Sequence, residues 1–331
     1  MQQTIETREL FELDAIDGVV RGTYHKAHNE SSLPLSDLTE ERIGVVFLNS
    51  LTPTRAATGD SAVYWAESFA ELGYPSFRFD PPGFGDSDGE PPTELLNFVN
   101  AGGYASISSA SITELARRFR LSGVVTVGLC AGAVSALYTA AASKECRGVV
   151  LMDPYFFVPV VTGLNRWQEL QRKFTNRMSR NARGRQIISI YDRLTSFKKF
   201  LPGNSLPPSA NVPLLNCWKS VSSAGMPILL LKAPHTNLKV GEFDYLNYIL
   251  ETAGPRSRVQ VKVVEDTGHS FANRVGRAAV RETTENWLRV CFPLEKHGEF
   301  AGNAPPSEFN ADTGHSRAAK IVSVAKIFSG V

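Results

Sequence analysis

Residues 126–133 read Thr-Val-Gly-Leu-Cys-Ala-Gly-Ala, which places Cys130 between Gly128 and Gly132. A cysteine in a sharp turn from a strand into a helix projects above the sheet and faces the positive end of the helix dipole. Small neighbours suit such a turn because strand and helix approach closely there. The pattern predicts that the Cys130 thiolate attacks an acyl carbon, although a small buried residue in a glycine-rich turn would give the same pattern.

A nucleophilic cysteine needs a base, and the chain has six histidines. His269 lies in Asp266-Thr-Gly-His-Ser-Phe271, just beyond a predicted strand at 259–264 and before a predicted helix. We interpret His269 as the general base, against the alternative of an exposed loop histidine. His235 follows another predicted strand and could also lie near the site.

The third member of the catalytic set is open between two residues. Asp153 ends the predicted strand 148–152, and Asn237 follows the predicted strand 227–231, where no carboxylate is present. Either side chain could orient the imidazole and fix its tautomer. Asp153 is favoured, with a turn-forming Asp-Pro as its structural alternative.

The oxyanion of a tetrahedral intermediate needs positioned N–H donors. One donor is predicted to be the backbone N–H of Ala131, directly after the cysteine. The second is expected in the loop Asn49-Ser-Leu-Thr-Pro-Thr-Arg55, from Leu51 or Thr52, because Pro53 has no N–H. This loop contains no His-Gly pair.

These side chains need a scaffold that brings distant segments together. An opening hairpin at 8–14 and 17–25 is followed by alternating strands and helices, which predicts an α/β fold with a mostly parallel, doubly wound sheet. Its active-site loops would share the carboxyl edge of the sheet, where Cys130 and His269 can meet. The further predicted strands are 43–48, 75–79, 123–128, 148–152, 227–231 and 259–264, and the helices are 59–73, 92–120 and 131–143.

A third stretch, Arg78-Phe-Asp-Pro-Pro-Gly-Phe-Gly-Asp-Ser-Asp-Gly89, is similar to the signature R-x-D-x-x-G-x-G-x-S-x-G after the fourth strand of α/β-hydrolases. With the cysteine turn and the histidine loop, it makes the chain resemble the α/β-hydrolase fold family, with cysteine in place of serine. The nearest resemblance is to exosortase-associated hydrolases. It covers roughly residues 8–154 and 226–292. We interpret Asp80, Gly83, Gly85 and Ser87 mainly as turn architecture.

The resemblance also bears on the third member. Most of the family places an aspartate after the seventh strand, which this chain lacks. Some relatives, notably polyketide-type thioesterases, carry the acid after the sixth strand, the position that Asp153 would occupy.

The same resemblance divides the chain into a hydrolase core at 1–154 and 225–295, a helical cap at 155–224 and a C-terminal extension at 296–331. Residues 166–199 hold ten Lys and Arg against two acids. This excess is typical of a solvated helical face. The sharper interpretation is an anionic partner: a substrate carboxylate or phosphate, coenzyme A or an acidic carrier protein.

The predicted reaction is acyl chemistry on an ester, thioester or lactone through a thioester acyl-enzyme. One alternative is an acyltransferase or cyclising-release enzyme that uses the same residues. Another is a non-catalytic relative that binds a ligand or a partner protein, which the missing aspartate and His-Gly pair favour and the intact Gly-x-Cys-x-Gly disfavours.

Composition narrows the remaining classes. The 331 residues are 43% hydrophobic with a formal net charge of +2, which argues against a polyanion binder, and no nucleic-acid motif is present. The sequence has no motif for a metal or an organic cofactor. Four widely spaced cysteines, no secretory signal and no membrane-spanning apolar run lead us to expect a cytoplasmic enzyme.

Overall fold

The computed structural model describes residues 7–15, 18–28, 42–48, 54–158, 206–234, 239–240 and 243–294. The expected cap is described only at its two ends, so its basic stretch 166–199 lies outside these ranges. The expected C-terminal extension lies outside them as well. Four residues that the sequence analysis named also lie outside the described ranges: Leu51, Thr52, Asn237 and His235.

Within the described ranges, eight strands form one sheet in the order β1-β2-β4-β3-β5-β6-β7-β10. The β1–β2 and β2–β4 pairs are antiparallel and all the others are parallel, as the alternation of elements predicts. The strands are β1 (Arg8–Ala15), β2 (Gly18–His25), β3 (Arg42–Leu48), β4 (Ser76–Phe79), β5 (Leu121–Leu129), β6 (Cys146–Met152), β7 (Pro227–Lys232) and β10 (Arg258–Val263). A separate pair consists of β8 (Lys239–Val240) and β9 (Phe243–Asp244).

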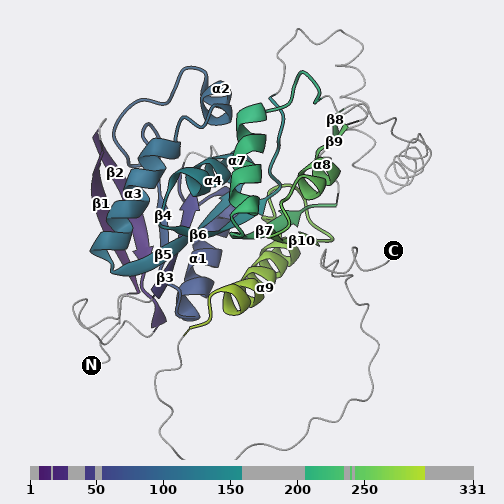
Figure 1. The fold of residues 1–331 in the computed structure, drawn as a ribbon. Coiled ribbons are helices and arrows are strands. Elements are labelled where there is room, and N and C mark those ends of the chain that lie inside the picture. The colour runs from purple at the N-terminus through teal and green to yellow at the C-terminus, as the bar shows by residue number, and fades with distance from the viewer. Residues whose placement is uncertain are drawn as a thin grey trace, which may run out of the picture. The chain divides into compact units, whose positions relative to one another are not determined.

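Helices cover both faces of the sheet (Figure 1). On one face lie α1 (Ser61–Glu71) and α9 (Arg274–Cys291), joined by a hydrogen bond from Trp65 Nε1 to the Arg277 carbonyl. The other face carries α2 (Leu95–Asn100), α3 (Ala105–Arg118), α4 (Ala131–Ala142), α7 (Val212–Ser223) and α8 (Tyr245–Glu251). The central strands are buried on both faces, which explains their continuous apolar runs.

The predicted helix 92–120 is divided into α2 and α3 at its glycine pair. Gly102 has φ 77°, and a Cβ there would lie 2.9 Å from the Tyr138 ring on α4. Only glycine combines this backbone with so close an approach, so the chain turns there and α3 packs beside α4.

The chain divides into two compact units, Met1–Phe156 with Asn211–Val331 and Phe157–Ala210. In the first unit, the Asn211 N–H donates to the Phe156 carbonyl at 2.9 Å, so the chain leaves and rejoins this unit at one place. In the second unit, Phe157 pairs with Ala210 as an antiparallel bridge. The domain bounds predicted from the sequence stay a prediction.

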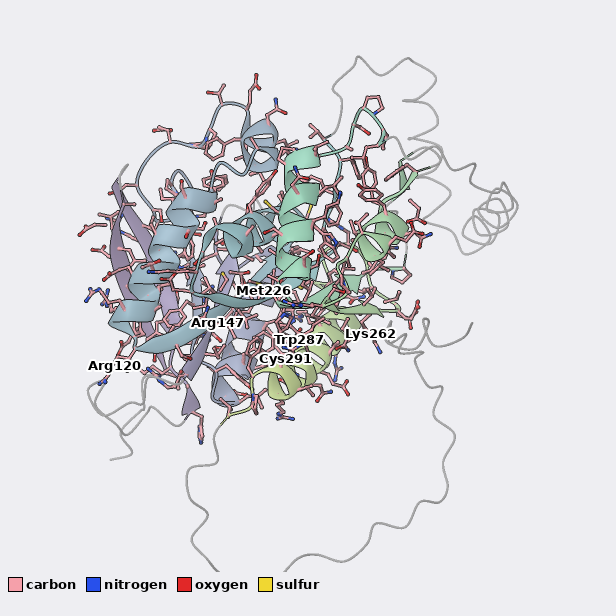
Figure 2. All side chains as sticks on the ribbon, viewed as in Figure 1. Arg120, Arg147, Met226, Lys262, Trp287 and Cys291 are labelled. Carbon is pink, nitrogen blue, oxygen red and sulfur yellow. The ribbon has the colours of Figure 1, made fainter. Side chains whose placement is uncertain are left out.

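The sheet has an amino edge, where the parallel strands begin, and a carboxyl edge, where they end. Figure 2 labels Arg120, Arg147 and Met226, which precede or begin β5, β6 and β7 at the amino edge. The sequence candidates follow the opposite ends of these strands, so any site that they form lies at the carboxyl edge. No described helix is both long and apolar enough to cross a lipid bilayer.

Candidate active site

Cys130 occupies the turn between β5 and α4 with φ 55° and ψ −115°, a conformation that residues other than glycine rarely adopt. Its N–H donates to the Met152 carbonyl at 2.9 Å, which fixes the turn to the end of β6. A Cβ on Gly128 would lie 2.1 Å from the Gly132 carbonyl oxygen, so strand and helix touch where the glycines are. The half-buried thiol is thus held in a rigid, strained turn.

Ala131 is the first residue of α4 and is buried. The N–H groups of a first helical turn have no acceptor within the helix, and they form the positive end of its dipole. The Ala131 N–H therefore suits an oxyanion that forms beside Cys130. The second predicted donor, from Leu51 or Thr52, lies outside the described residues.

Asp153 follows β6 and has φ 45°. Its N–H donates to the Leu231 carbonyl at 2.8 Å, and its Oδ1 accepts from the Ala233 N–H at 3.0 Å. The residue is 4% exposed, so its carboxylate is desolvated and held in one orientation by β7. Oδ2 is directed to a different partner.

That partner is His269, whose Nδ1 lies 3.0 Å from Asp153 Oδ2. Cys130 also acts on the imidazole, and because Nδ1 faces the carboxylate, Nε2 is the nitrogen left for sulfur. Asp153 first and Cys130 second raise the pKa of His269 from 6.5 to about 10. The ring therefore carries a positive charge at neutral pH, between a carboxylate and the thiol.

Hydrogen bonds hold the loop that carries His269, and they join residues before His269 to residues after it. Asn273 caps α9 by accepting from the Gly276 N–H at 2.7 Å, and its Nδ2 donates to the Asp266 carbonyl at 2.8 Å. Phe271 is fully buried, and its N–H donates to the Gly268 carbonyl. These contacts leave the imidazole, half exposed at 48%, as the part of the loop that faces the site.

Among the described residues, Asp153 is the acid that contacts His269. Asp244, the next described acid after β7, instead caps α8 by accepting from the Leu246 and Asn247 N–H groups. Asn237 is outside the described residues. The structure thus brings together Cys130, His269 and Asp153 from the ends of three strands.

Sequence reasoning missed the contacts of Arg55, which ends the expected oxyanion loop. Its Nη1 lies 2.5 Å from Asp80 Oδ2 and 2.8 Å from Asp86 Oδ2, and Arg78 Nη1 donates to the Arg55 carbonyl. Asp80 is fully buried, and the Ser87 hydroxyl donates to its carbonyl at 2.6 Å. Asp80 and Ser87 therefore build the turn, as interpreted from the sequence, and Asp80 also anchors Arg55. A lone arginine in a loop gives no local signal of such a contact.

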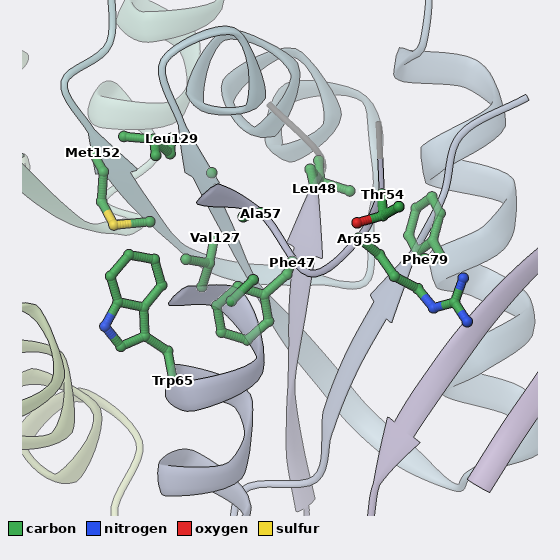
Figure 3. Close-up of a pocket in the computed structure, with 12 residues that line it drawn as sticks. Phe47, Leu48, Thr54, Arg55, Ala57, Trp65, Phe79, Val127, Leu129 and Met152 are labelled. Atoms are coloured by element: carbon green, nitrogen blue, oxygen red, sulfur yellow. The ribbon is translucent and has the colours of Figure 1, made fainter. Parts of the chain in front are cut away.

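An apolar pocket lies beneath the cysteine turn, between the sheet and α1 (Figure 3). Met152 and Trp65 lie together on one side of it, and Arg55 with Phe79 on the other. Gly128 and Leu129 also line it, so the pocket reaches the strand that carries Cys130.

The described residues hold no cluster of three or more His, Cys, Asp or Glu side chains that could bind a metal ion. All four cysteines are free thiols. The arrangement provides a thiol, an imidazole and a carboxylate in series. They lie beside a helix N-terminus, which can stabilise an oxyanion.

Several solved structures share this fold at low sequence identity. An esterase of Pyrococcus furiosus is 16% identical with a TM-score of 0.55, over 86% of this chain and 91% of that one. The α/β-hydrolase GrgF from Penicillium sp. sh18 is 17% identical with a TM-score of 0.54, over 87% and 99%. An α/β serine hydrolase homologue from Coxiella burnetii is 14% identical with a TM-score of 0.51, over 86% and 100%.

No protein of curated function matches the sequence significantly. The family model described as "Alpha/beta hydrolase family" matches residues 45–282, which is more than half of the chain and includes Cys130, Asp153 and His269. The expected α/β-hydrolase fold and the expected enzyme class are confirmed, and the chain belongs to the alpha/beta hydrolase family.

Proposed function

We propose that this hydrolase is an acyl hydrolase, an esterase or thioesterase, that uses Cys130 as its nucleophile. The observation that carries the proposal is the Asp153 carboxylate 3.0 Å from His269 Nδ1, on an imidazole whose pKa both Asp153 and Cys130 raise. The strained backbone of Cys130 adds to it, since such strain persists where function requires the geometry. The resemblance of this turn to exosortase-associated hydrolases also supports a cysteine here.

Acylation begins with the sulfur as thiolate and His269 as imidazolium. Sγ attacks the substrate acyl carbon, an S–C bond forms, and the carbonyl π electrons move to oxygen, which the Ala131 N–H stabilises. The intermediate collapses as the bond to the leaving alkoxide or thiolate breaks. His269 gives that group the Nε2 proton, and a thioester acyl-enzyme remains.

Deacylation needs His269 as a base rather than an acid. The thioester sulfur no longer carries charge, so one of the two groups that raise the His269 pKa is lost, and the neutral imidazole becomes accessible. It takes a proton from water as the oxygen attacks the acyl carbon. Collapse breaks the C–S bond, releases the carboxylic acid and restores the thiolate–imidazolium pair.

Acyl transfer is the second candidate, and the cysteine itself favours it. A thioester passes its acyl group readily to amines, so the same intermediate serves a transferase or a cyclising-release enzyme. An activated acyl donor carried on coenzyme A or an acidic carrier protein would fit either outcome. A ligand-binding protein without catalysis is the remaining alternative.

The test is intact mass after incubation with a panel of acyl thioesters and aryl esters, with product release followed in parallel. Wild type should gain one acyl group and turn over, and Cys130→Ala should do neither. Amines added as second acceptors then separate transfer from hydrolysis. Turnover that persists in Cys130→Ala would exclude the cysteine mechanism.

Alkylation by iodoacetamide at pH 6.5 provides a second readout that needs no substrate. Burial raises the pKa of the thiols of Cys217 and Cys291, and that of Cys146 to about 12, so these three are internal controls. Cys130 should be alkylated at least tenfold faster than they are, and His269→Ala should remove the difference. An unreactive Cys130 without turnover would favour the binding protein.

A further inference from the structure

A second pocket lies at the carboxyl edge of the sheet, and it shares Leu48 and Phe79 with the pocket of Figure 3. It is enclosed by the ends of β3 and β4 on one side and by α3 and α4 on the other. Three of its lining residues carry hydroxyls. Its lining consists of Leu48, Phe79, Pro81, Tyr104, Ser108 and Ser135.

Tyr104 is the unusual member of this lining. It is 7% exposed, and its hydroxyl is buried without a hydrogen-bond partner among the described residues. A buried polar group without a partner is unfavourable, because nothing replaces the hydrogen bonds it would make to water. Burial also raises the pKa of Tyr104 to about 12, so the phenol remains a hydrogen-bond donor at every physiological pH. The lining of the pocket therefore includes a residue whose buried donor has no acceptor among the described residues.

Two observations place this pocket beside the cysteine. Leu48 pairs in register with Gly128, two residues before Cys130. Ser135 lies five residues beyond Cys130 on α4, which corresponds to about 7.5 Å along the helix axis. A ligand that is attached to the Cys130 sulfur could reach the pocket with an extended chain of about six bonds.

We propose that this pocket is a subsite that binds an oxygen-bearing group, a ketone or a hydroxyl, on a carbon about five bonds from the reacting carbonyl carbon of the acyl chain. This inference rests on the proposed acyl hydrolase. Tyr104 donates to the oxygen of that group, and the hydroxyls of Ser108 and Ser135 provide further donors. The favoured substrates are then oxygenated acyl groups rather than plain alkanoates.

A methylene group in this pocket would leave the Tyr104 hydroxyl buried and unpartnered, whereas a carbonyl oxygen would satisfy it. Sites built to hydrogen-bond a ligand group discriminate strongly against analogues that lack it. Leu48, Phe79 and Pro81 meanwhile contact the hydrocarbon part of the chain.

The experiment compares 6-oxoheptanoyl and heptanoyl thioesters, a pair that differs only in the ketone. The ratio of kcat/KM for the two should fall about tenfold in Tyr104→Phe, the equivalent of about 1.4 kcal/mol. The matched control is Tyr74→Phe, which removes a buried hydroxyl that donates to the Phe292 carbonyl at 2.8 Å, on a residue that lines neither pocket. Its ratio should equal that of wild type.

A ratio that moves less than twofold in Tyr104→Phe, or equally in both variants, would overturn the subsite. Absence of turnover with either thioester would instead overturn the proposed function, and binding then decides the subsite. Calorimetry of Cys130→Ala with methyl 6-oxoheptanoate and methyl heptanoate, with and without Tyr104→Phe, should give the same tenfold change in the ratio of Kd values. An unchanged ratio of Kd values would overturn the subsite without reference to catalysis.

Discussion

Cys130 has a positive φ that its own side chain disfavours, and its surroundings hold it there. The Met152 carbonyl accepts its N–H, while Gly128 and Gly132 pack so closely that the turn has no room to relax. Such strain amounts to about 1–3 kcal/mol and is kept where it serves a site. The positive φ of Cys130 therefore lowers the stability of the fold, although it suits the proposed role of the thiol.

Glycine should accordingly be more stable than alanine at position 130. Glycine adopts this backbone without steric penalty, so Cys130→Gly should exceed Cys130→Ala in free energy of unfolding by about 1 kcal/mol, measured by urea denaturation. At the exposed helix position Ala141 the order reverses, and Ala141→Gly should cost about 0.5–1 kcal/mol. Equal stability of the two variants at 130 would show that the turn stores no strain.

The charge on His269 depends chiefly on the Asp153 carboxylate. Asp153→Asn should lower the pKa of His269 from about 10 toward 6.5, observed as the NMR titration of the ring protons. The folded-state pKa is raised, so the stabilisation is complete below about pH 6.5 and is lost as the pH rises through about 10. Asp153→Asn should therefore flatten the pH dependence of stability in that interval.

His25 is the internal reference in the same spectra. Burial lowers its pKa to about 3, with Arg78 as a further cause, and Asp153 is not among the groups that act on it. Its ring should stay neutral in both proteins over the whole interval. A His269 pKa that remains near 10 in Asp153→Asn would mean that another group holds the charge.

Elements were the part of the structure most readily predicted from the sequence. Continuous apolar runs located the parallel strands to within about two residues, since a strand buried on both faces has few other possible compositions. The position of Cys130 and His269 at one edge of the sheet followed from that, because the ends of parallel strands share one edge. The choice of Asp153 over Asn237 was weaker, since both follow strands.

Contacts between elements could not be predicted in the same way. The ion pair of Arg55 with Asp80, and the pocket between Tyr104 and Ser135, join residues that are 25 and 31 positions apart. Neither has a local pattern, because each depends on how β3 and β4, or α3 and α4, pack once the sheet has formed.

The spacing between β5 and α4 gives a prediction for the elements themselves. Gly128→Ala would place a Cβ 2.1 Å from the Gly132 carbonyl, which is backbone and cannot rotate away. The helix must shift, so we expect a loss of about 3 kcal/mol or more in the free energy of unfolding, together with loss of Cys130 alkylation. Thermal and urea denaturation measure the first effect, and peptide mass mapping the second.

Gly268→Ala is the matched control, since Gly268 is next to His269 and a Cβ there meets nothing within 4 Å. Its stability should stay within about 0.5 kcal/mol of wild type. A stable Gly128→Ala protein that retains alkylation would show that strand and helix are not in contact.

At the scale of the whole molecule, the chain separates into two units, and the first contains every described residue of the candidate site. The two ends of the second unit meet, because the Val158 N–H donates to the Ser209 carbonyl at 2.7 Å and Phe157 pairs with Ala210. Next to them, Asn211 caps α7 by accepting from the Leu214 N–H. The first unit therefore has its own capped helix where the chain returns to it.

This arrangement predicts that the second unit is dispensable for folding and for the nucleophile, but not for substrate choice. Joining Val158 to Ser209 through Asn-Gly uses a two-residue turn that suits an antiparallel pair. The shortened protein should unfold cooperatively in circular dichroism and keep both the Cys130 alkylation and its dependence on His269. Its preference among acyl chains should weaken, measured as kcat/KM across a thioester series, because the part of the chain where the cap is predicted is gone. A shortened protein that fails to fold would instead mean that residues 159–208 contribute to the core, and the division into two units would not describe how this chain folds.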